Sequence, residues 1–219
     1  MVLEKITGKI VNGEFPTGMT LPSEGNLAIS FGVSRTVMRE VMRTLRALGL
    51  IEMSRGKRPR VKAPDLQEAI VGLDLLLRRN HASLLNLVEV RRPLETEIAA
   101  LAAERANDEH LRQLEQSVHE LESAPDLRNR IEADVRFHRV LAEATGNPVF
   151  VLILQALAGF LRESRSRTLN YSGVERAVSS HRAVLDAIRA RDAEAARSAM
   201  LKHLRHATHD LKGIQTRGR

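Results

Sequence analysis

Cysteine and tryptophan are absent from this 219-residue chain, and aromatic residues make up only 3% of it. Without cysteine, the chain has no disulfide, no thiolate nucleophile and no cysteine-based zinc site, which fits a reducing cytoplasm. The scarcity of aromatic residues argues against a protein that binds single-stranded nucleic acid, because such proteins stack bases on aromatic side chains. The longest strongly apolar run, residues 149–153, is far shorter than the ~20 residues of a membrane span. The N-terminus also lacks an export signal, so we expect a cytoplasmic protein with no membrane partner.

The charge that is present is unevenly distributed. Of the net charge of +7, a surplus of six lies in residues 1–64, which contain 11 Lys+Arg against 5 Asp+Glu. The remaining residues are nearly neutral, and they contain all eight histidines. This asymmetry predicts two domains, residues 1–63 and residues 64–219, with Ala63-Pro64-Asp65 as the hinge. The first would bind a polyanion, for which duplex DNA is the best candidate, and the second would bind a metal or ligand.

The basic segment has the pattern of a helix-turn-helix. Ser23 and Ser34 are good N-caps for two helices separated by Gly32, and the second helix extends to Gly49. Apolar residues follow one face of that second helix, namely Met38, Val41, Met42, Leu45 and Leu48. Arg35 and Arg39 lie one turn apart near its start, where a recognition helix meets base edges in the major groove. The alternative interpretation is an ordinary solvated basic face.

A short hairpin is predicted after these helices. Residues 50–54 and 59–63 are predicted to form two short β segments on either side of Arg55-Gly56-Lys57-Arg58. A glycine-bearing tip flanked by cations can approach a phosphate backbone or a narrow minor groove closely. The segment therefore predicts the wing of a winged helix-turn-helix.

Several motifs in the basic segment resemble those of one family. They are Leu21-Pro22-Ser23-Glu24, Leu27-Ala28, Val33-Ser34-Arg35-Thr36, Arg39-Glu40 and Leu45-Arg46-Ala47-Leu48-Gly49-Leu50-Ile51, and together they resemble the winged helix-turn-helix of GntR-family bacterial regulators. The resemblance implies operator contacts from Ser34, Arg35, Thr36, Arg39 and Arg46, and from Arg55, Gly56 and Lys57 at the wing tip. Most members carry Arg after the Leu-Pro-Ser-Glu tetrad, whereas this chain has Gly25, which puts one usual DNA contact in doubt.

The neutral two-thirds of the chain is predicted to be helical. Strand-like alternation is absent, and most glycines and prolines fall at expected helix boundaries. The expected helices span residues 66–79, 83–106, 108–124, 126–145, 148–169, 173–189 and 192–211. The natural packing solution is an all-α helical bundle, so the whole chain is predicted to be mainly α, with a small β wing.

Three of these helices place polar residues on apolar stripes. Asp134 and His138 share a helical face with Ile131, Val135 and Leu141. His181 lies between Val178, Leu185 and Ile188, and His203 lies between Met200, Leu204 and Ala207. A carboxylate and imidazoles are not buried without a partner, and together they suit Zn²⁺, Ni²⁺, Mn²⁺ or Fe²⁺. The alternative is a set of separate core or surface histidines, each satisfied by hydrogen bonds.

A second resemblance concerns the helical segment. Glu132-Ala133-Asp134-Val135-Arg136-Phe137-His138 with Asn147-Pro148, and the run from His181 to Ile188, resemble the FCD ligand domain of FadR-subfamily GntR regulators. Members with Asp and three His at these places bind a divalent metal, which implies Asp134, His138, His181 and His203 as ligands. Zinc or nickel is the first expectation, with manganese or iron as alternatives.

The same resemblance implies a small carboxylate effector that completes the metal coordination. Arg91 best matches an arginine that pairs with such effectors, with its neighbour Arg92 as an alternative, and either could instead form a surface salt bridge to Glu95. Ser164, Arg165 and Arg167 are further residues that could face the cavity. His110, His119, His206 and His209 are interpreted as surface residues, with His206 or His209 as an alternative metal ligand on the last helix.

These interpretations predict a transcription regulator, not an enzyme. We expect a repressor that binds a double-stranded DNA operator as a homodimer and responds to an organic or sugar acid. Two other hypotheses stay open at this point. The metal itself could be the signal, or the metal could activate water in a metal-dependent hydrolase.

Overall fold

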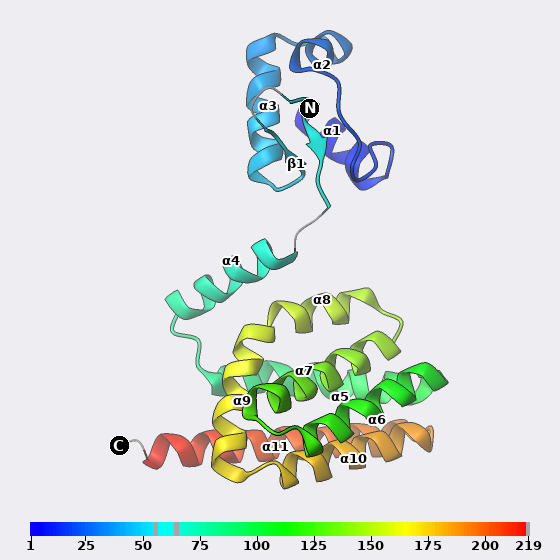
Figure 1. The fold of residues 1–219 in the computed structure, drawn as a ribbon, viewed down its shortest axis with the longest axis vertical. Coiled ribbons are helices and arrows are strands. Elements are labelled where there is room, and N and C mark those ends of the chain that lie inside the picture. The colour runs from blue at the N-terminus through cyan, green and yellow to red at the C-terminus, as the bar shows by residue number, and fades with distance from the viewer. Residues whose placement is uncertain (55–56, 64–65, 218–219) are drawn as a thin grey trace. The chain divides into compact units, whose positions relative to one another are not determined.

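The computed structural model describes residues 1–54, 57–63 and 66–217. The described residues form 11 helices and one two-stranded sheet, which confirms the predicted mainly-α fold (Figure 1). The chain divides into two compact units, Met1–Glu68 and Ala69–Arg219, which we call the N-terminal unit and the helical unit. A functional boundary at residues 63 and 64 stays a prediction.

The N-terminal unit is a three-helix domain with a small hairpin. Its elements are α1 (Val2–Val11), α2 (Glu24–Phe31), α3 (Arg35–Ala47), β1 (Ile51–Glu52) and β2 (Arg60–Val61). The two strands are antiparallel, with Ile51 opposite Val61, and are shorter than the predicted β segments. Arg55 and Gly56, predicted at the wing tip, lie outside the described residues.

Local caps explain where α2 and α3 begin and where α2 ends. The Ser23 hydroxyl accepts a hydrogen bond from the Asn26 amide at 3.2 Å, and the Ser34 hydroxyl accepts one from the Val37 amide at 3.2 Å. Between them, Gly32 ends α2 in the left-handed conformation, with φ +66°, which glycine adopts without strain. These features produce the predicted helix-turn-helix.

The apolar stripe of α3 is shorter than the sequence predicted. Met38, Met42 and Leu45 are buried, and they form one core with Ile6, Leu21, Leu27, Ala28, Ile51 and Val61. Leu48, which was expected to continue the stripe, is 60% exposed. The prediction was wrong there because α3 ends at Ala47 and Leu48 is its C-cap.

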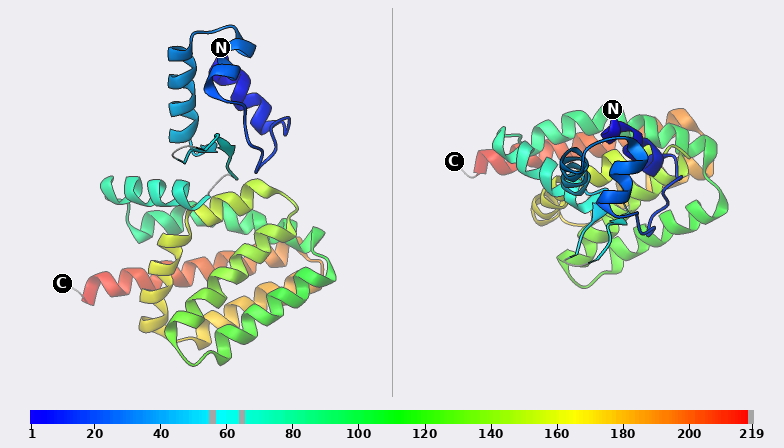
Figure 2. Two further views of the ribbon diagram at one scale, coloured as in Figure 1. Left: turned by 45° about the horizontal axis from the view of Figure 1, so that its top comes forward. Right: turned by 90° about the horizontal axis from the view of Figure 1, so that it is seen from above.

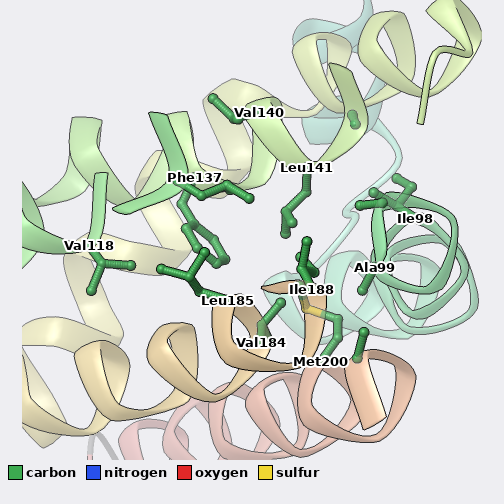
Figure 3. Packing of buried hydrophobic residues seen from close by; sticks show 14 of the residues in the cluster. Ile98, Ala99, Val118, Phe137, Val140, Leu141, Val184, Leu185, Ile188 and Met200 are labelled. Carbon is green, nitrogen blue, oxygen red and sulfur yellow. The ribbon is translucent and has the colours of Figure 1, made fainter. Parts of the chain in front are cut away.

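The helical unit is an all-α bundle. Its elements are α4 (Leu66–Arg79), α5 (Leu84–Arg105), α6 (Asp108–Ser123), α7 (Leu127–Ala144), α8 (Pro148–Ala156), α9 (Ala158–Ser172), α10 (Glu175–Arg189) and α11 (Ala193–Arg217). Helix α11 packs along α5 and α10, and α6 packs along α7 (Figures 1 and 2). The core between them includes Phe137, Leu141, Leu185, Ile188 and Met200 (Figure 3).

Two predicted helix boundaries in this unit were wrong. Residues 148–169 form two helices, because the chain turns at Leu157, with φ −92° and ψ 0°, just before the weak helix former Gly159. Helix α11 continues past residue 211 to Arg217. Gly213 does not end α11, because it lies in the helix where the ring of Tyr171 packs so closely that a Cβ would clash.

Among the described residues, no helix combines the length and the apolar character needed to span a lipid bilayer.

Candidate metal centre and DNA-binding surface

The four predicted metal ligands converge at one point in the helical unit. Asp134 and His138 come from α7, His181 from α10 and His203 from α11, and each is at most 3% exposed. One nitrogen from each of the three imidazoles lies within 4.8 Å of the others. The carboxylate joins them, since Asp134 Oδ1 lies 3.4 Å from His181 Nε2 and Asp134 Oδ2 lies 3.6 Å from His138 Nε2. Three helices thus supply one carboxylate and three imidazoles to a common centre.

The buried face of α7 differs slightly from the predicted stripe. Phe137 is fully buried, whereas Ile131 and Val135 are only half-buried. The Phe137 ring stacks on the His181 ring, with centroids 4.1 Å apart and planes 7° apart. Phe137, which the sequence pattern did not single out, therefore fixes the orientation of one imidazole.

Arg165 of α9 inserts its guanidinium among the four side chains. Its Nη2 atom lies 2.7 Å from His203 Nε2 and 3.3 Å from His138 Nε2. Its Nε atom lies 2.7 Å from Asp134 Oδ2. The neighbouring residues differ, since Ser164 is buried whereas Arg167 is exposed and pairs with Glu163. The sequence named these three residues together but had no argument for choosing between them.

A second buried ion pair borders the centre. Arg91 of α5 is fully buried and pairs with Glu95 through Nε and through an Nη2–Oε2 bond of 3.2 Å. Arg91 Nη2 also lies 3.4 Å from His138 Nε2, and Glu95 Oε2 lies 2.6 Å from His138 Nδ1. The interpretation of this pair as a surface salt bridge was therefore wrong. Arg92, the alternative to Arg91, points to solvent.

Burial and charge set the protonation of the centre. Burial lowers the pKa of His181 to about 3 although Asp134 opposes this, and burial with the Arg165 charge holds the pKa of His203 well below its usual value. Burial alone would raise the pKa of Asp134, but the Arg165 guanidinium and the nearby imidazoles lower it below its usual value. At neutral pH His181 and His203 are therefore neutral and Asp134 is ionised, which are the forms that bind metal.

The donor atoms fit a metal ion. Both carboxylate oxygens of Asp134 and both ring nitrogens of His181 are buried, and among the described residues they make no contact with good hydrogen-bond geometry. Buried polar atoms are rarely left in this state, and metal coordination would satisfy them. Three imidazoles and one carboxylate are a donor set suited to zinc or nickel.

A small pocket adjoins this centre between α9, α10 and α11. It is lined by Arg165 and His203 at its inner end, and by Thr168, Arg176, His206 and Asp210. Its free volume of about 20 Å³ has room for one water molecule. His206 is thus half-buried beside the centre and not a simple surface residue, whereas His119 and His209 are exposed and His110 lies at the start of α6.

The predicted DNA-binding residues lie on an exposed face of the N-terminal unit. Arg35, Thr36, Arg39 and Arg46 all point to solvent along α3, and Lys57 is exposed in the wing. Ser34 is exposed at the start of α3, where its hydroxyl forms the N-cap. A Cβ at position 25 would lie 3.9 Å from Arg35 Nε, which is an ordinary van der Waals contact, so a side chain there would lie directly beside this arginine.

Comparison with known families identifies the chain. The model of the bacterial regulatory proteins of the GntR family matches residues 1–61, and the model of the FCD domain matches residues 86–206. The chain belongs to the GntR family. The predicted family, the helix-turn-helix and the helical FCD domain are thereby confirmed.

Individual GntR-family relatives match along almost the whole chain. It is 34% identical to the HTH-type transcriptional repressor NanR of Cronobacter sakazakii over 93% of this chain and 81% of that protein. It is also 34% identical to the galactonate operon transcriptional repressor of Escherichia coli K12, over 94% of this chain and 93% of that protein. A solved GntR structure from Streptococcus agalactiae has a TM-score of 0.76 and 26% identity over 95% of this chain and 97% of that one.

These relatives also bear on whether the chain is an enzyme or a regulator. The GntR-family proteins that match nearly the full length of the chain are named as transcriptional repressors, which confirms the prediction of a regulator and not an enzyme. The hypothesis of a metal-dependent hydrolase is not supported.

Proposed function

We propose that this protein is a transcriptional repressor whose affinity for its operator is controlled by a small carboxylate bound at a divalent metal. The observation that carries this proposal is the convergence of Asp134, His138, His181 and His203 from three helices at one buried point. The Asp134 oxygens and the His181 nitrogens, which make no hydrogen bond of good geometry among the described residues, lie inside a domain of the FCD family. Two relatives named as repressors support the direction of regulation.

The metal would be held by these four side chains, with zinc or nickel as the leading candidates. When bound, a divalent ion with open coordination positions supplies a positive charge that attracts a carboxylate. Arg91, fully buried beside His138, would supply a further positive charge for the same ligand. One relative is named for the galactonate operon, so sugar acids are the effector class to test first.

DNA recognition would follow from the exposed face of α3 and the wing. We propose that Ser34, Arg35, Thr36, Arg39 and Arg46 contact the operator, with Arg55, Gly56 and Lys57 at the wing tip. Two copies of the chain in a homodimer would place two recognition helices in successive major grooves of a palindromic site. The effector changes operator affinity only if its own affinity differs between the protein conformation that binds DNA and the conformation that has released DNA.

A metal-responsive regulator is the second candidate, and the same buried three-imidazole group favours it. In that case the ion alone would alter DNA affinity, without an organic ligand. The two functions therefore differ in whether a carboxylate is needed, and one titration separates them.

The test is fluorescence anisotropy on a labelled duplex from the region upstream of the protein's own gene, with unlabelled nonspecific competitor. Metal-stripped protein is titrated with Zn²⁺, with D-galactonate and a panel of other sugar acids, and with both together. We expect specific binding that weakens steeply with salt, and release only when metal and acid are both present. Release by zinc alone would favour the metal-responsive regulator.

A matched control is His181→Ala, compared with His119→Ala at an exposed position of α6. We expect His181→Ala to bind the duplex but to lose its response to the acid, whereas His119→Ala responds as the wild type does. Full release of His181→Ala by the same acid would contradict the proposed role of the metal centre.

A further inference from the structure

The most unusual group in the helical unit is the guanidinium of Arg165. It lies within 3.3 Å of two imidazole nitrogens and 2.7 Å from the Asp134 carboxylate, so it contacts three of the four side chains that would hold the metal. These are the same atoms that an ion would use. The fourth, His181, contacts Asp134 and stacks on Phe137.

The charges of the buried centre balance without a metal. Two guanidinium groups, Arg91 and Arg165, face two carboxylates, Glu95 and Asp134, and all four are at most 3% exposed. Adding a divalent ion gives this cluster a surplus of two positive charges in a place with little water. Such a surplus is strongly unfavourable in a medium of low dielectric constant.

The contact distances lead to the same conclusion. Arg165 Nη2 lies 2.7 Å from His203 Nε2 and Arg165 Nε lies 2.7 Å from Asp134 Oδ2, and a zinc ion would lie about 2.0–2.2 Å from the same nitrogen and oxygen atoms. An ion that takes His138, His203 and Asp134 as ligands must therefore displace the guanidinium from them. A displaced guanidinium needs a new anionic partner, because a buried cation without one is destabilising.

We propose that the Arg165 guanidinium competes with the metal for the same ligand atoms, and that a carboxylate relieves this competition by forming an ion pair with the guanidinium. The inference rests on the metal site of the proposed function, and it adds that metal binding and carboxylate binding are coupled. The metal and the carboxylate bind cooperatively. The carboxylate offsets the surplus positive charge that the metal adds, and the metal frees the guanidinium from the contacts that would compete with the carboxylate. By linkage, the metal raises the affinity for the carboxylate by the same factor.

The experiment measures zinc affinity of the full-length, metal-stripped protein by competition with a chromophoric zinc indicator. The wild type is compared with Arg165→Gln, which keeps polarity and removes the charge. Arg167→Gln is the matched control, because Arg167 lies on the same helix but is exposed and pairs with Glu163. His181→Ala tests whether the zinc binds at this centre. Circular dichroism verifies that each variant is folded.

We expect Arg165→Gln to bind zinc at least about tenfold more tightly than the wild type, and Arg167→Gln to match the wild type. Equal or weaker zinc binding by folded Arg165→Gln would overturn the competition. Zinc binding that His181→Ala leaves intact, or no zinc binding by any protein, would overturn the proposed metal site and this inference with it.

A second measurement tests the role of the carboxylate. Zinc affinity of the wild type and of Arg165→Gln is measured with and without acetate, a small carboxylate that can pair with a guanidinium, at constant ionic strength in chloride. We expect acetate to tighten zinc binding by the wild type at least about threefold and to leave Arg165→Gln unchanged. If Arg165→Gln does not fold, the acetate titration of the wild type is the deciding test. Zinc binding that is not tightened by acetate would then overturn the proposal.

Discussion

At the scale of single residues, the metal centre shows how charged groups are tolerated inside an apolar bundle. Asp134 is fully buried, yet its pKa is lowered, because the positive charge of Arg165 and the nearby imidazoles outweigh the effect of burial. Glu95 behaves in the same way, since burial opposes ionisation but Arg91 and His138 lower its pKa. Each carboxylate is thus ionised because a buried arginine and at least one imidazole lie beside it.

The lowered pKa of His181 predicts acid sensitivity of the metal-free protein. The folded state resists protonation down to about pH 3, whereas an unfolded histidine takes up a proton near pH 6.5. Stability is therefore full above pH 6.5 and falls as the pH is lowered from there. Acidification from pH 7 to pH 5 should reduce the free energy of unfolding by about 2 kcal/mol through His181 alone.

This is measured by urea unfolding of protein stripped of metal, at a series of pH values. His181→Gln should show a shallower pH dependence than the wild type, and His119→Gln, at an exposed site, should match the wild type. A pH dependence that is the same in all three proteins would show that His181 titrates normally in the folded state.

Arg39→Ala is predicted to weaken operator binding by about 10- to 100-fold, because one bidentate arginine–guanine pair contributes about 1–3 kcal/mol of discrimination. Arg39 is exposed on α3, and its only described ion pair, with Glu24 at 3.7 Å, is a weak surface contact. Fluorescence anisotropy measures the effect, with Arg112→Ala on the exposed face of α6 as the control. A loss in the Arg39 variant no larger than that of the control would exclude a base contact.

The sequence identified some of these residues and missed others for a clear reason. Asp134 and His138 are four apart on one helix, so helical periodicity alone places them together. The apolar stripes around His181 and His203 pointed to these two residues, and the family resemblance joined all four into one site. Arg165 and Glu95 lie on two further helices, and the rotation of those helices about their axes depends on packing that no single-helix pattern encodes. Their roles therefore emerged only from the fold.

At the scale of secondary-structure elements, caps decide where the helices begin, and caps are readable from sequence. Ser34 before α3 lies where a polar N-cap was predicted, Asp126 before α7 lies at the predicted start of its helix, and each accepts a hydrogen bond from an amide of the first turn. Interruptions inside a helix are harder to predict from sequence. The turn at Leu157 has no proline, and Gly213 lies inside α11, where a Cβ would clash with Tyr171.

Asp126→Ala is predicted to destabilise the helical unit by about 1 kcal/mol, because the Asp126 side chain caps α7 through the Asn129 amide at 2.9 Å. Asp186→Ala removes the same charge from an exposed position of α10 and should change stability by less than about 0.5 kcal/mol. Urea unfolding followed by circular dichroism compares the two. Equal midpoints would show that this cap contributes nothing to the stability of the unit.

At the scale of the whole molecule, a GntR-family DNA-binding unit is joined to an FCD-family helical unit. The proposed palindromic operator would require two copies of the chain. Large apolar side chains of the helical unit are exposed in the single chain, and they lie mainly on α4 and α8, namely Val71, Leu75, Leu76, Val149, Leu152 and Ile153. Such exposed apolar residues are typical of surfaces that become buried in an oligomer.

A homodimer is therefore predicted in solution. Sedimentation equilibrium should give a mass of about twice the 24.4 kDa of one chain, at the concentrations used for DNA binding. Addition of operator duplex should yield one dimer per palindromic site. A species of one chain mass that binds the full operator would contradict this arrangement.

The most direct test of the central claim is a crystal structure of the zinc-loaded protein, with an anomalous difference map recorded at the zinc absorption edge. The account predicts one strong peak per chain, within about 2.0–2.2 Å of nitrogens of His138, His181 and His203 and of an Asp134 oxygen. Zinc found only at exposed histidines such as His119 or His209, with Asp134 and the three buried imidazoles free of it, would contradict the metal-centred account of this regulator.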